Sequence, residues 1–208
     1  MRLLVIDTGL AVCQAAVFDG EHQLAALAEP MARGHQERLA PMVRDVMATA
    51  GVSFAELDRI GVTVGPGSFT GVRVGLAFAK GLSVALERPC VGVGTLAALS
   101  ASLAGGDRRA AVIDAGRGQI YVQLFEGAAE LTAPDILPLE TAAARLLELS
   151  PVDCLIGPQA SRLATALPAT ETVDLTAPSP AAIAGMALTA AAIPPRPLYL
   201  RPPDAKVR

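Results

Sequence analysis

The sequence predicts an α/β protein built from two copies of one βββαβα-type unit, the second of them reduced. Residues 4–9 (Leu-Val-Ile-Asp-Thr-Gly) match residues 111–116 (Ala-Val-Ile-Asp-Ala-Gly), and a Phe-acid-Gly triplet follows at the same spacing in both, at 18–20 and 125–127. Each copy has the pattern of an apolar strand, a tight Asp-x-Gly turn, a second strand and a glycine turn into a third. This shared order predicts an internal duplication.

The boundary between the two copies is expected at the turn that contains Gly105, Gly106 and Asp107. Residues 1–105 would then form an N-terminal subdomain, and residues 106–208 a reduced C-terminal subdomain with a proline-rich tail. A chain of 208 residues with 52% apolar side chains is large enough to bury a full core.

After its three strands, the first copy should continue as an amphipathic helix over about 36–50, because apolar side chains recur there at helical spacing. Pro41 should fall in or near the first turn of this helix, where proline removes no hydrogen bond. Ser53 and Glu56 have the spacing of a capping box and predict a short helical turn. Residues 59–65 follow as a β-branched strand that leads into a Gly-Pro-Gly turn.

The next helix, from about residue 70 to residue 86, is apolar on nearly all sides. Its apolar side chains form two stripes: Val74, Ala77, Phe78 and Leu82 in one, and Val72, Leu76, Ala79 and Leu86 in the other. A helix that is apolar all round is usually buried, but a subdomain of half this chain is too small to cover it on every side. The pattern therefore predicts a surface for a partner protein.

The remaining elements follow from the same periodicities. They are a strand at 90–94 and a helix at 95–103 in the first copy, and helices at 140–149, 160–167 and 180–193 with a strand at 152–156 in the second. The second copy thus repeats the order of the first with fewer and shorter elements.

The composition argues against a protein that binds nucleic acid by itself. Aromatic residues make up 3% of the chain and the net charge is −3, whereas binding of nucleic acid needs stacking platforms and clustered Lys and Arg. Any contact with nucleic acid is therefore expected mainly through a partner. Cys13, Cys90 and Cys154 are widely spaced and are expected in the core. The apolar run at the N-terminus is too short for a signal peptide, and no apolar stretch has the length of a membrane span, so a cytoplasmic location is expected.

The two Asp-x-Gly turns leave two interpretations open. Folds such as those of actin, hexokinase and Hsp70 use turns of this kind to present backbone amides to the phosphates of ATP and an acidic side chain to magnesium. Asp7 and Asp114 would be those acids, with Thr8 and Gly9 completing the first turn. The alternative is that Asp and Gly simply build a hairpin turn.

Four segments together carry a resemblance to a known family. They are residues 6–9 (Ile-Asp-Thr-Gly), 34–41 (Gly-His-Gln-Glu-Arg-Leu-Ala-Pro), 65–75 (Gly-Pro-Gly-Ser-Phe-Thr-Gly-Val-Arg-Val-Gly) and 199–205 (Tyr-Leu-Arg-Pro-Pro-Asp-Ala). The chain resembles the bacterial TsaB family over nearly its whole length, and 65–75 is the most specific segment. The resemblance implies the actin-like ATPase fold and a cytoplasmic role in making threonylcarbamoyladenosine in tRNA, beside the catalytic subunit TsaD and the ATPase TsaE.

The resemblance also implies that the catalyst is the partner. The related catalytic family carries a His-x-x-x-His metal pair directly after the strand that here is 91–93, and Thr95 and Leu99 occupy those places. Leucine cannot bind a metal ion, so no metal site is expected. Pro158 stands where nucleotide-binding relatives use a Gly-Gly turn, and no set of side chains suggests a nucleophile. We therefore expect no catalytic residue and no cofactor of its own; Asp7, Thr8, Gly9 and Asp114 would be vestigial, and ATP or ADP would bind only at the junction with the partner.

The resemblance, with the second apolar stripe, predicts a scaffold. The helices over 36–50 and 70–86 are expected to form a face that pairs with TsaD, and with a second copy of this chain when TsaD is absent. The residues assigned to this face are Leu39, Val43, Met47, Val72, Arg73, Leu76, Ala79 and Lys80. The rival prediction is a free-standing ATP-dependent phosphotransferase or hydrolase, in which Asp7 and Asp114 hold magnesium between the subdomains.

Two residues near these helices keep two interpretations each. His35 either lies at a partner or nucleotide interface or is a helix-start residue hydrogen-bonded to local backbone. Arg73 either is a solvated helix charge or contacts an anion or carboxylate near the helix N-terminus.

Overall fold

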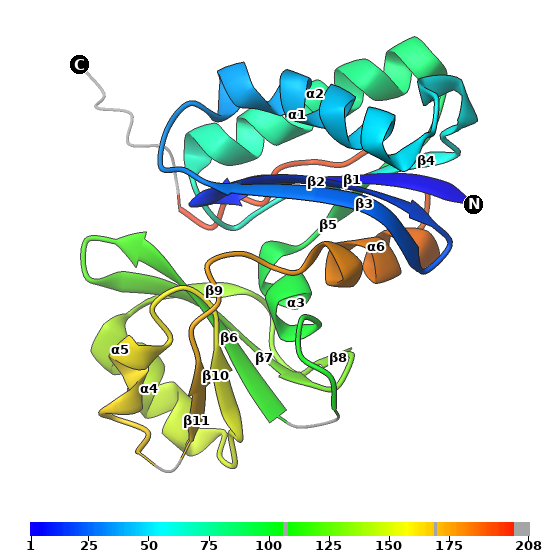
Figure 1. Ribbon diagram of the computed structural model, residues 1–208. Helices are drawn as coiled ribbons and strands as arrows, with labels where there is room; N and C mark the ends of the chain where they lie inside the picture. Colours follow the sequence, from blue (N-terminus) through cyan, green and yellow to red (C-terminus); the bar gives the residue numbers. More distant parts are fainter. Residues whose placement is uncertain (106–107, 169, 202–208) are drawn as a thin grey trace, which may run out of the picture.

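The computed structural model describes residues 1–105, 108–168 and 170–201, and it forms two subdomains, each with its own sheet (Figure 1). The strands of the first sheet are β1 (Arg2–Leu10), β2 (Val12–Asp19), β3 (His22–Pro30), β4 (Arg59–Thr63) and β5 (Cys90–Val93). They lie in the order β3-β2-β1-β4-β5. The three strands β1, β2 and β3 are antiparallel neighbours, whereas β4 and β5 run parallel to β1.

The second sheet repeats this topology. Its strands are β6 (Arg108–Gly116), β7 (Gln119–Glu126), β8 (Ala129–Glu130), β9 (Asp135–Pro138), β10 (Cys154–Ile156) and β11 (Glu171–Val173). The order is β11-β10-β6-β7-β8, and β9 also pairs with β7. Since β7 is antiparallel to β6 while β10 and β11 are parallel to it, β6 corresponds to β1. The predicted duplication is confirmed, with shorter strands in the second copy.

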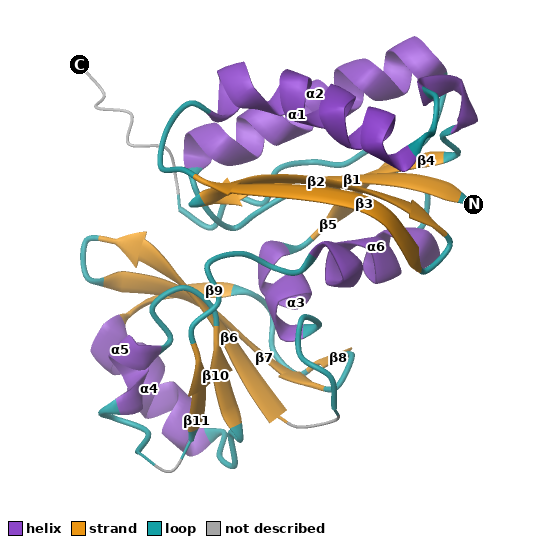
Figure 2. Ribbon diagram, viewed as in Figure 1, coloured by secondary structure: helices purple, strands orange, loops and turns teal. Residues whose placement is uncertain are grey.

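Helices cover both faces of the first sheet (Figure 2). The helices α1 (His35–Ala50) and α2 (Phe69–Leu86) lie side by side on the outer face, over a core built from β1, β2 and β4. The opposite face is covered by α6 (Pro180–Thr189), which packs on β1, β4 and β5.

The second sheet is covered less completely. On one face lie α4 (Leu139–Glu148) and the single turn α5 (Ser161–Ala164). On the other lies α3 (Thr95–Ser100), whose apolar side chains pack against β6 and β7, so that α3 fills the space between the two subdomains.

The predicted domain division is wrong at the C-terminus. Residues 106–208 were assigned to the second subdomain, but α6 and the segment after it return to the first sheet. Arg59 on β4 donates to the Ala187 carbonyl of α6 at 2.7 Å, and Leu198 donates its amide to the Val64 carbonyl at 2.8 Å. Of the predicted boundary turn, residues 106 and 107 lie outside the described residues.

Two further expectations need correction. Pro41 lies inside α1 and not in its first turn, because the helix already begins at His35 after Gly34, whose φ is +92°. Three of the predicted helices, at 95–103, 160–167 and 180–193, end several residues earlier, at Ser100, Ala164 and Thr189. The predicted capping box is confirmed, since the Glu56 carboxylate accepts from the backbone amide of Ser53 at 2.8 Å and a short 3₁₀ turn (Phe54–Glu56) follows.

Candidate functional site

The first Asp-x-Gly turn buries its carboxylate completely. Asp7 Oδ1 accepts from the Gly9 amide at 2.9 Å and from Thr63 Oγ1 at 2.5 Å, and Oδ2 accepts from Gln14 Nε2 at 2.9 Å. Burial raises the pKa of Asp7 above its ordinary value, while these hydrogen bonds and the nearby His35 oppose that rise. The carboxylate therefore ties β1 to β2 and β4, and all of these donors belong to the protein itself.

The glycine-rich segment before and within α2 is packed against this same turn. A Cβ atom on Gly67 would overlap the Gly9 carbonyl oxygen, and one on Gly71 would overlap the Thr8 carbonyl oxygen. A Cβ atom on Gly75 would press on Thr8 Oγ1, which donates to the Gly71 carbonyl at 2.7 Å. Gly71 and Gly75 are four residues apart, so they lie on one face of the helix, and Gly67 precedes it by one turn. In this chain the most specific motif therefore docks α2 onto the turn.

The second Asp-x-Gly turn is open to solvent. Asp114 Oδ1 accepts from the Gly116 amide at 2.9 Å and from Arg162 Nη1 at 3.1 Å, which makes an ion pair. Asp114 lines the cleft between the subdomains, whereas Asp7 is sealed beneath the first turn. The structure therefore does not bring the two predicted acids together in one accessible site.

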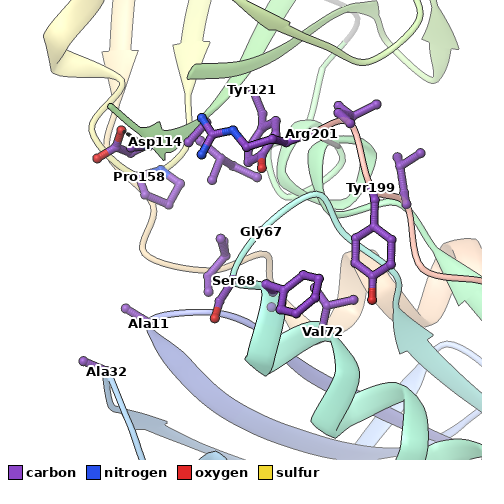
Figure 3. A pocket seen from close by; sticks show the side chains of 18 of the residues that line it. Ala11, Ala32, Gly67, Ser68, Val72, Asp114, Tyr121, Pro158, Tyr199 and Arg201 are labelled. Carbon is purple, nitrogen blue, oxygen red and sulfur yellow. Dashed lines mark hydrogen bonds between the residues drawn. The ribbon is translucent and has the colours of Figure 1, made fainter. Parts of the chain in front are cut away.

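The cleft has a volume of about 790 Å³ and is lined by both turns, the start of α2 and residues 198–201 (Figure 3). Most of the lining is apolar; its polar side chains include Ser68, Asp114, Tyr121 and Arg201. His35 also lines the cleft, is 8% exposed, and its Nε2 has no hydrogen-bond partner among the described residues. A buried imidazole nitrogen without a partner favours the interface interpretation of His35 over a helix-start residue that is satisfied locally.

The positions that correspond to the metal pair of the catalytic relatives are part of the core. Thr95 and Leu99 on α3 are fully buried, and Leu99 packs between the subdomains. Within the described ranges, no group of three His, Cys, Asp or Glu side chains lies close enough to hold a metal ion. Pro158 lines the cleft beside Gly157, whose φ of +126° and contact with the Val112 carbonyl leave no room for a side chain.

The predicted partner face needs correction, because six of its eight residues are buried. The six are at most 4% exposed because they form the core between the helices and the first sheet; they are Leu39, Val43, Met47, Val72, Leu76 and Ala79. Arg73 and Lys80 are exposed as predicted. Both stripes of α2 are apolar, and the stripe that contains Val72, Leu76 and Ala79 faces the first sheet.

The outward stripe of α2 forms an apolar surface instead. Phe69 is 51% exposed and Val84 is 79% exposed. A groove of about 520 Å³ lies between α1 and the first half of α2; it is lined by Gln36, Leu39, Phe69, Thr70, Arg73, Val74, Ala77 and Phe78. The spacing of Gly71 and Gly75 is the signal that could have identified the inward side, because close helix packing needs residues without side chains.

Among the described residues, α2 is also the helix whose length and composition would suffice to cross a membrane, with a mean hydropathy of 1.3 over 18 residues. Core helices of globular proteins meet the same criterion, and α2 packs on β1 and β4 along its inward stripe.

One residue that the sequence analysis did not assign to the site joins the cleft to the groove. Tyr199 accepts a hydrogen bond at its Oη from Arg73 Nε at 2.8 Å, and its ring centroid lies 5.3 Å from that of Phe69. The next residues along the chain line the cleft, and Arg201 donates to Gln119 of β7 at 2.6 Å.

Comparison with known proteins connects this architecture to tRNA modification. A family model described as TsaD, tRNA N6-adenosine threonylcarbamoyltransferase, matches residues 27–191. The tRNA threonylcarbamoyladenosine biosynthesis protein TsaB of Escherichia coli is 38% identical over 124 residues, which cover 58% of this chain and 53% of that protein. The chain thus matches about half the length of this curated relative.

Solved structures show similarity over nearly the whole chain. YeaZ from Pseudomonas aeruginosa is 28% identical and superposes with a TM-score of 0.78, covering 96% of this chain and 99% of that one. The activator of 2-hydroxyisocaproyl-CoA dehydratase from Clostridium difficile, solved with bound ADPNP, shares the fold at 9% identity with a TM-score of 0.57, over 90% of this chain and 93% of that one. The chain belongs to the TsaB (YeaZ) family of tRNA threonylcarbamoyladenosine biosynthesis proteins and has the duplicated actin-like ATPase fold.

Proposed function

We propose that this chain is a non-catalytic scaffold subunit of the cytoplasmic complex that transfers threonylcarbamoyl to adenosine in tRNA, and that it binds and activates a catalytic subunit of the TsaD type. The observation that carries the proposal is the outward apolar side of α2, where Phe69 is exposed and lines a groove and where Val84 is exposed further along the helix. Exposed apolar patches of this kind mark interaction surfaces. Burying one large apolar side chain contributes roughly 1.5–3 kcal/mol to association.

The family match supports the choice of partner. The TsaD family model matches residues 27–191, which include all of α1 and α2. A TsaD-type subunit is therefore expected to contain an equivalent pair of helices. Two related helix pairs can pack in a pseudo-symmetric way, as subunits do in twofold dimers. When the partner is absent, the same surface pairs weakly with a second copy of this chain.

The family match is also the basis on which we propose the other members of the complex. TsaE is the expected ATPase partner, and tRNA is contacted through the complex. A nucleotide, where one binds, lies at the junction with TsaD, because the Asp7 carboxylate is saturated by the protein's own donors. Thr95 and Leu99 supply no metal ligand pair, which supports a role without catalysis.

The test is analytical ultracentrifugation of this chain, alone and mixed with the TsaD subunit of the same organism. The wild-type chain should form a complex with TsaD, and Ala77→Asp, which places a charge in the groove, should weaken it. Ala144→Asp is the matched control, because Ala144 is also an exposed alanine in a helix, on α4. Absence of a complex with wild-type protein would refute the scaffold, and equal binding by both variants would refute the assigned face.

The cleft favours one alternative, a free-standing ATP-dependent phosphotransferase or hydrolase. Its volume of about 790 Å³ and the exposed Asp114 on its wall are the observations in support. Calorimetry of ATP with Mg²⁺ against the isolated chain distinguishes the two functions. Micromolar binding that is lost in Asp114→Ala would favour the enzyme, whereas the scaffold predicts no heat beyond dilution.

A further inference from the structure

The guanidinium group of Arg73 is held in a fixed position beside the α1–α2 groove. Its central carbon lies 3.6 Å from the centroid of the Phe69 ring and 5.6 Å from that of Tyr199. Its Nε donates to Tyr199 Oη at 2.8 Å. An exposed arginine usually samples many rotamers, and fixing such a side chain on binding costs roughly 0.5–1.5 kcal/mol. Here stacking and the hydrogen bond have fixed it in advance.

Tyr199 is fixed in turn by hydrogen bonds that the residues on either side of it make. The Leu198 amide donates to the Val64 carbonyl at 2.8 Å, in the first subdomain. Arg201 donates to Gln119 at 2.6 Å, in the second. The C-terminal segment is therefore anchored at both ends of the contact with Arg73, so Tyr199 acts as a positioning residue for the guanidinium group.

The charges on α2 are all of one sign. The helix contains Arg73 and Lys80, which are exposed and about two turns apart on the helix, and it contains no Asp or Glu. Among the described residues, neither cation has an ion pair, and only Nε of the Arg73 guanidinium donates a hydrogen bond. The acid Asp45 of the neighbouring helix α1 is paired within that helix, with Arg38 at 3.4 Å.

The positive charge of α2 favours some partners over others. A second copy of the chain that packed its α2 against this one would bring cation near cation, which opposes self-association. A helix that carries a carboxylate would pair with the free edge of Arg73, since guanidinium and carboxylate match in a planar, bidentate geometry. The groove beside it, lined by Val74, Ala77 and Phe78, is apolar and suits the rest of a protein helix, not a nucleic-acid backbone.

We propose that Arg73, positioned by Phe69 and Tyr199, is the specificity-determining contact of this face and binds an Asp or Glu side chain on a helix of a different protein subunit. The inference rests on the proposed function, because it names the chemistry by which the catalytic partner is recognised and a second copy is disfavoured. Arg73 takes no part in any reaction; it selects the partner.

The test measures affinity for the TsaD subunit by biolayer interferometry at low and high salt. Arg73→Gln should weaken binding by roughly tenfold to a hundredfold and flatten its salt dependence, since loss of one partner of an interfacial charge pair has effects of this order. Arg73→Lys should restore part of the affinity, and Tyr199→Phe, which keeps the ring but removes the acceptor, should cost roughly threefold. Arg145→Gln is the matched control, because Arg145 is an exposed arginine of α4 in an ion pair with Asp135.

Charge reversal identifies the partner group. Arg73→Glu should abolish binding, and replacing a single acidic residue on the helix pair of TsaD by Arg should restore it. If wild-type protein fails to bind TsaD, both the proposed function and this inference are refuted. If wild-type protein binds but Arg73→Gln binds equally well, only the inference is refuted. It is also refuted if Arg73→Gln weakens binding of tRNA alone, because the anion would then be a phosphate.

Discussion

At the scale of single residues, the Asp7 carboxylate is a structural link whose value can be measured. Asn at this position keeps the size but replaces one acceptor oxygen by a donor, which would face Gln14 Nε2, and Gln14 also donates to the Pro178 carbonyl at 2.8 Å. An unpaired buried donor costs roughly 1–3 kcal/mol. Asp7→Asn should therefore lower the free energy of unfolding by about that amount in a urea titration near neutral pH.

The duplicated turn supplies the control. Asp114 occupies the same place in the second copy but is exposed and pairs with Arg162 at the surface, where such pairs contribute about 1 kcal/mol or less. Asp114→Asn should accordingly be the milder of the two substitutions. Equal losses at the two positions would contradict the structural role of Asp7.

The ionisation of Asp7 should also appear in the pH dependence of stability. Burial raises its pKa above the ordinary 3.8, against hydrogen bonds from Thr63, Gly9 and Gln14. The folded state then holds the proton more tightly than the unfolded chain, so this stabilising contribution is complete below 3.8 and is lost as pH rises through the folded-state pKa. Urea titrations at a series of pH values should show that the free energy of unfolding falls more steeply with rising pH for wild-type protein than for Asp7→Asn. Parallel pH dependences of the two proteins would argue against a raised pKa.

Two glycines of α2 allow the docking of the motif to be tested within one helix. A side chain on Gly71 would overlap the Thr8 carbonyl oxygen, whereas one on Gly81 meets nothing within 4 Å. Gly71→Ala should destabilise the fold by more than about 2 kcal/mol, since the backbone itself has to move. Gly81→Ala should stabilise it by about 0.5–1 kcal/mol through helix propensity. Thermal unfolding followed by circular dichroism measures both, and similar effects of the two would contradict the close contact.

At the scale of elements, α6 shows why sequence order is a poor guide to subdomain membership. The helix follows the whole second copy, yet Ile183 is fully buried against the first sheet. Truncating a buried Ile to Ala costs roughly 2–5 kcal/mol. Ile183→Ala should therefore reduce hydrogen-exchange protection of amides in β1 and β4, while Leu147→Ala, at an exposed leucine of α4, should leave it unchanged. Loss of protection confined to the second sheet would contradict the placement of α6.

The elements also show which local patterns are reliable. The type and order of the predicted helices and strands are confirmed because period and capping are local properties, as with Ser53 and Glu56. The placement of α6 was missed because its small apolar side chains lack a polar face that would indicate which sheet it covers. The inward side of α2 differs from the prediction because the spacing of Gly71 and Gly75 indicates a close contact but not its partner, Thr8, which is far away in the sequence.

At the scale of the whole molecule, the sequence predicted the duplicated fold but not which of the two Asp-x-Gly turns would be buried. The Asp-x-Gly pattern is the same in both copies, but Asp7 is buried and Asp114 is exposed. The difference arises because α2 docks on the first turn, while the helices of the second copy, α4 and α5, are shorter. A pattern of residue types cannot show which of two equal turns another element will cover. The cleft residues Tyr199 and Arg201 likewise became neighbours of the site only through the path of the C-terminal segment.

The charge distribution on α2 makes a prediction for the assembly as a whole. If Arg73 and Lys80 oppose pairing of two copies, added salt should screen that repulsion and strengthen self-association of the chain. The complex with TsaD, which uses the attraction between Arg73 and a carboxylate, should weaken as the same salt is added. Sedimentation at NaCl from about 0.05 to about 0.5 M should thus give salt dependences of opposite sign for the two assemblies. The same sign in both would mean that apolar burial in the groove, and not charge, decides which partner this chain selects.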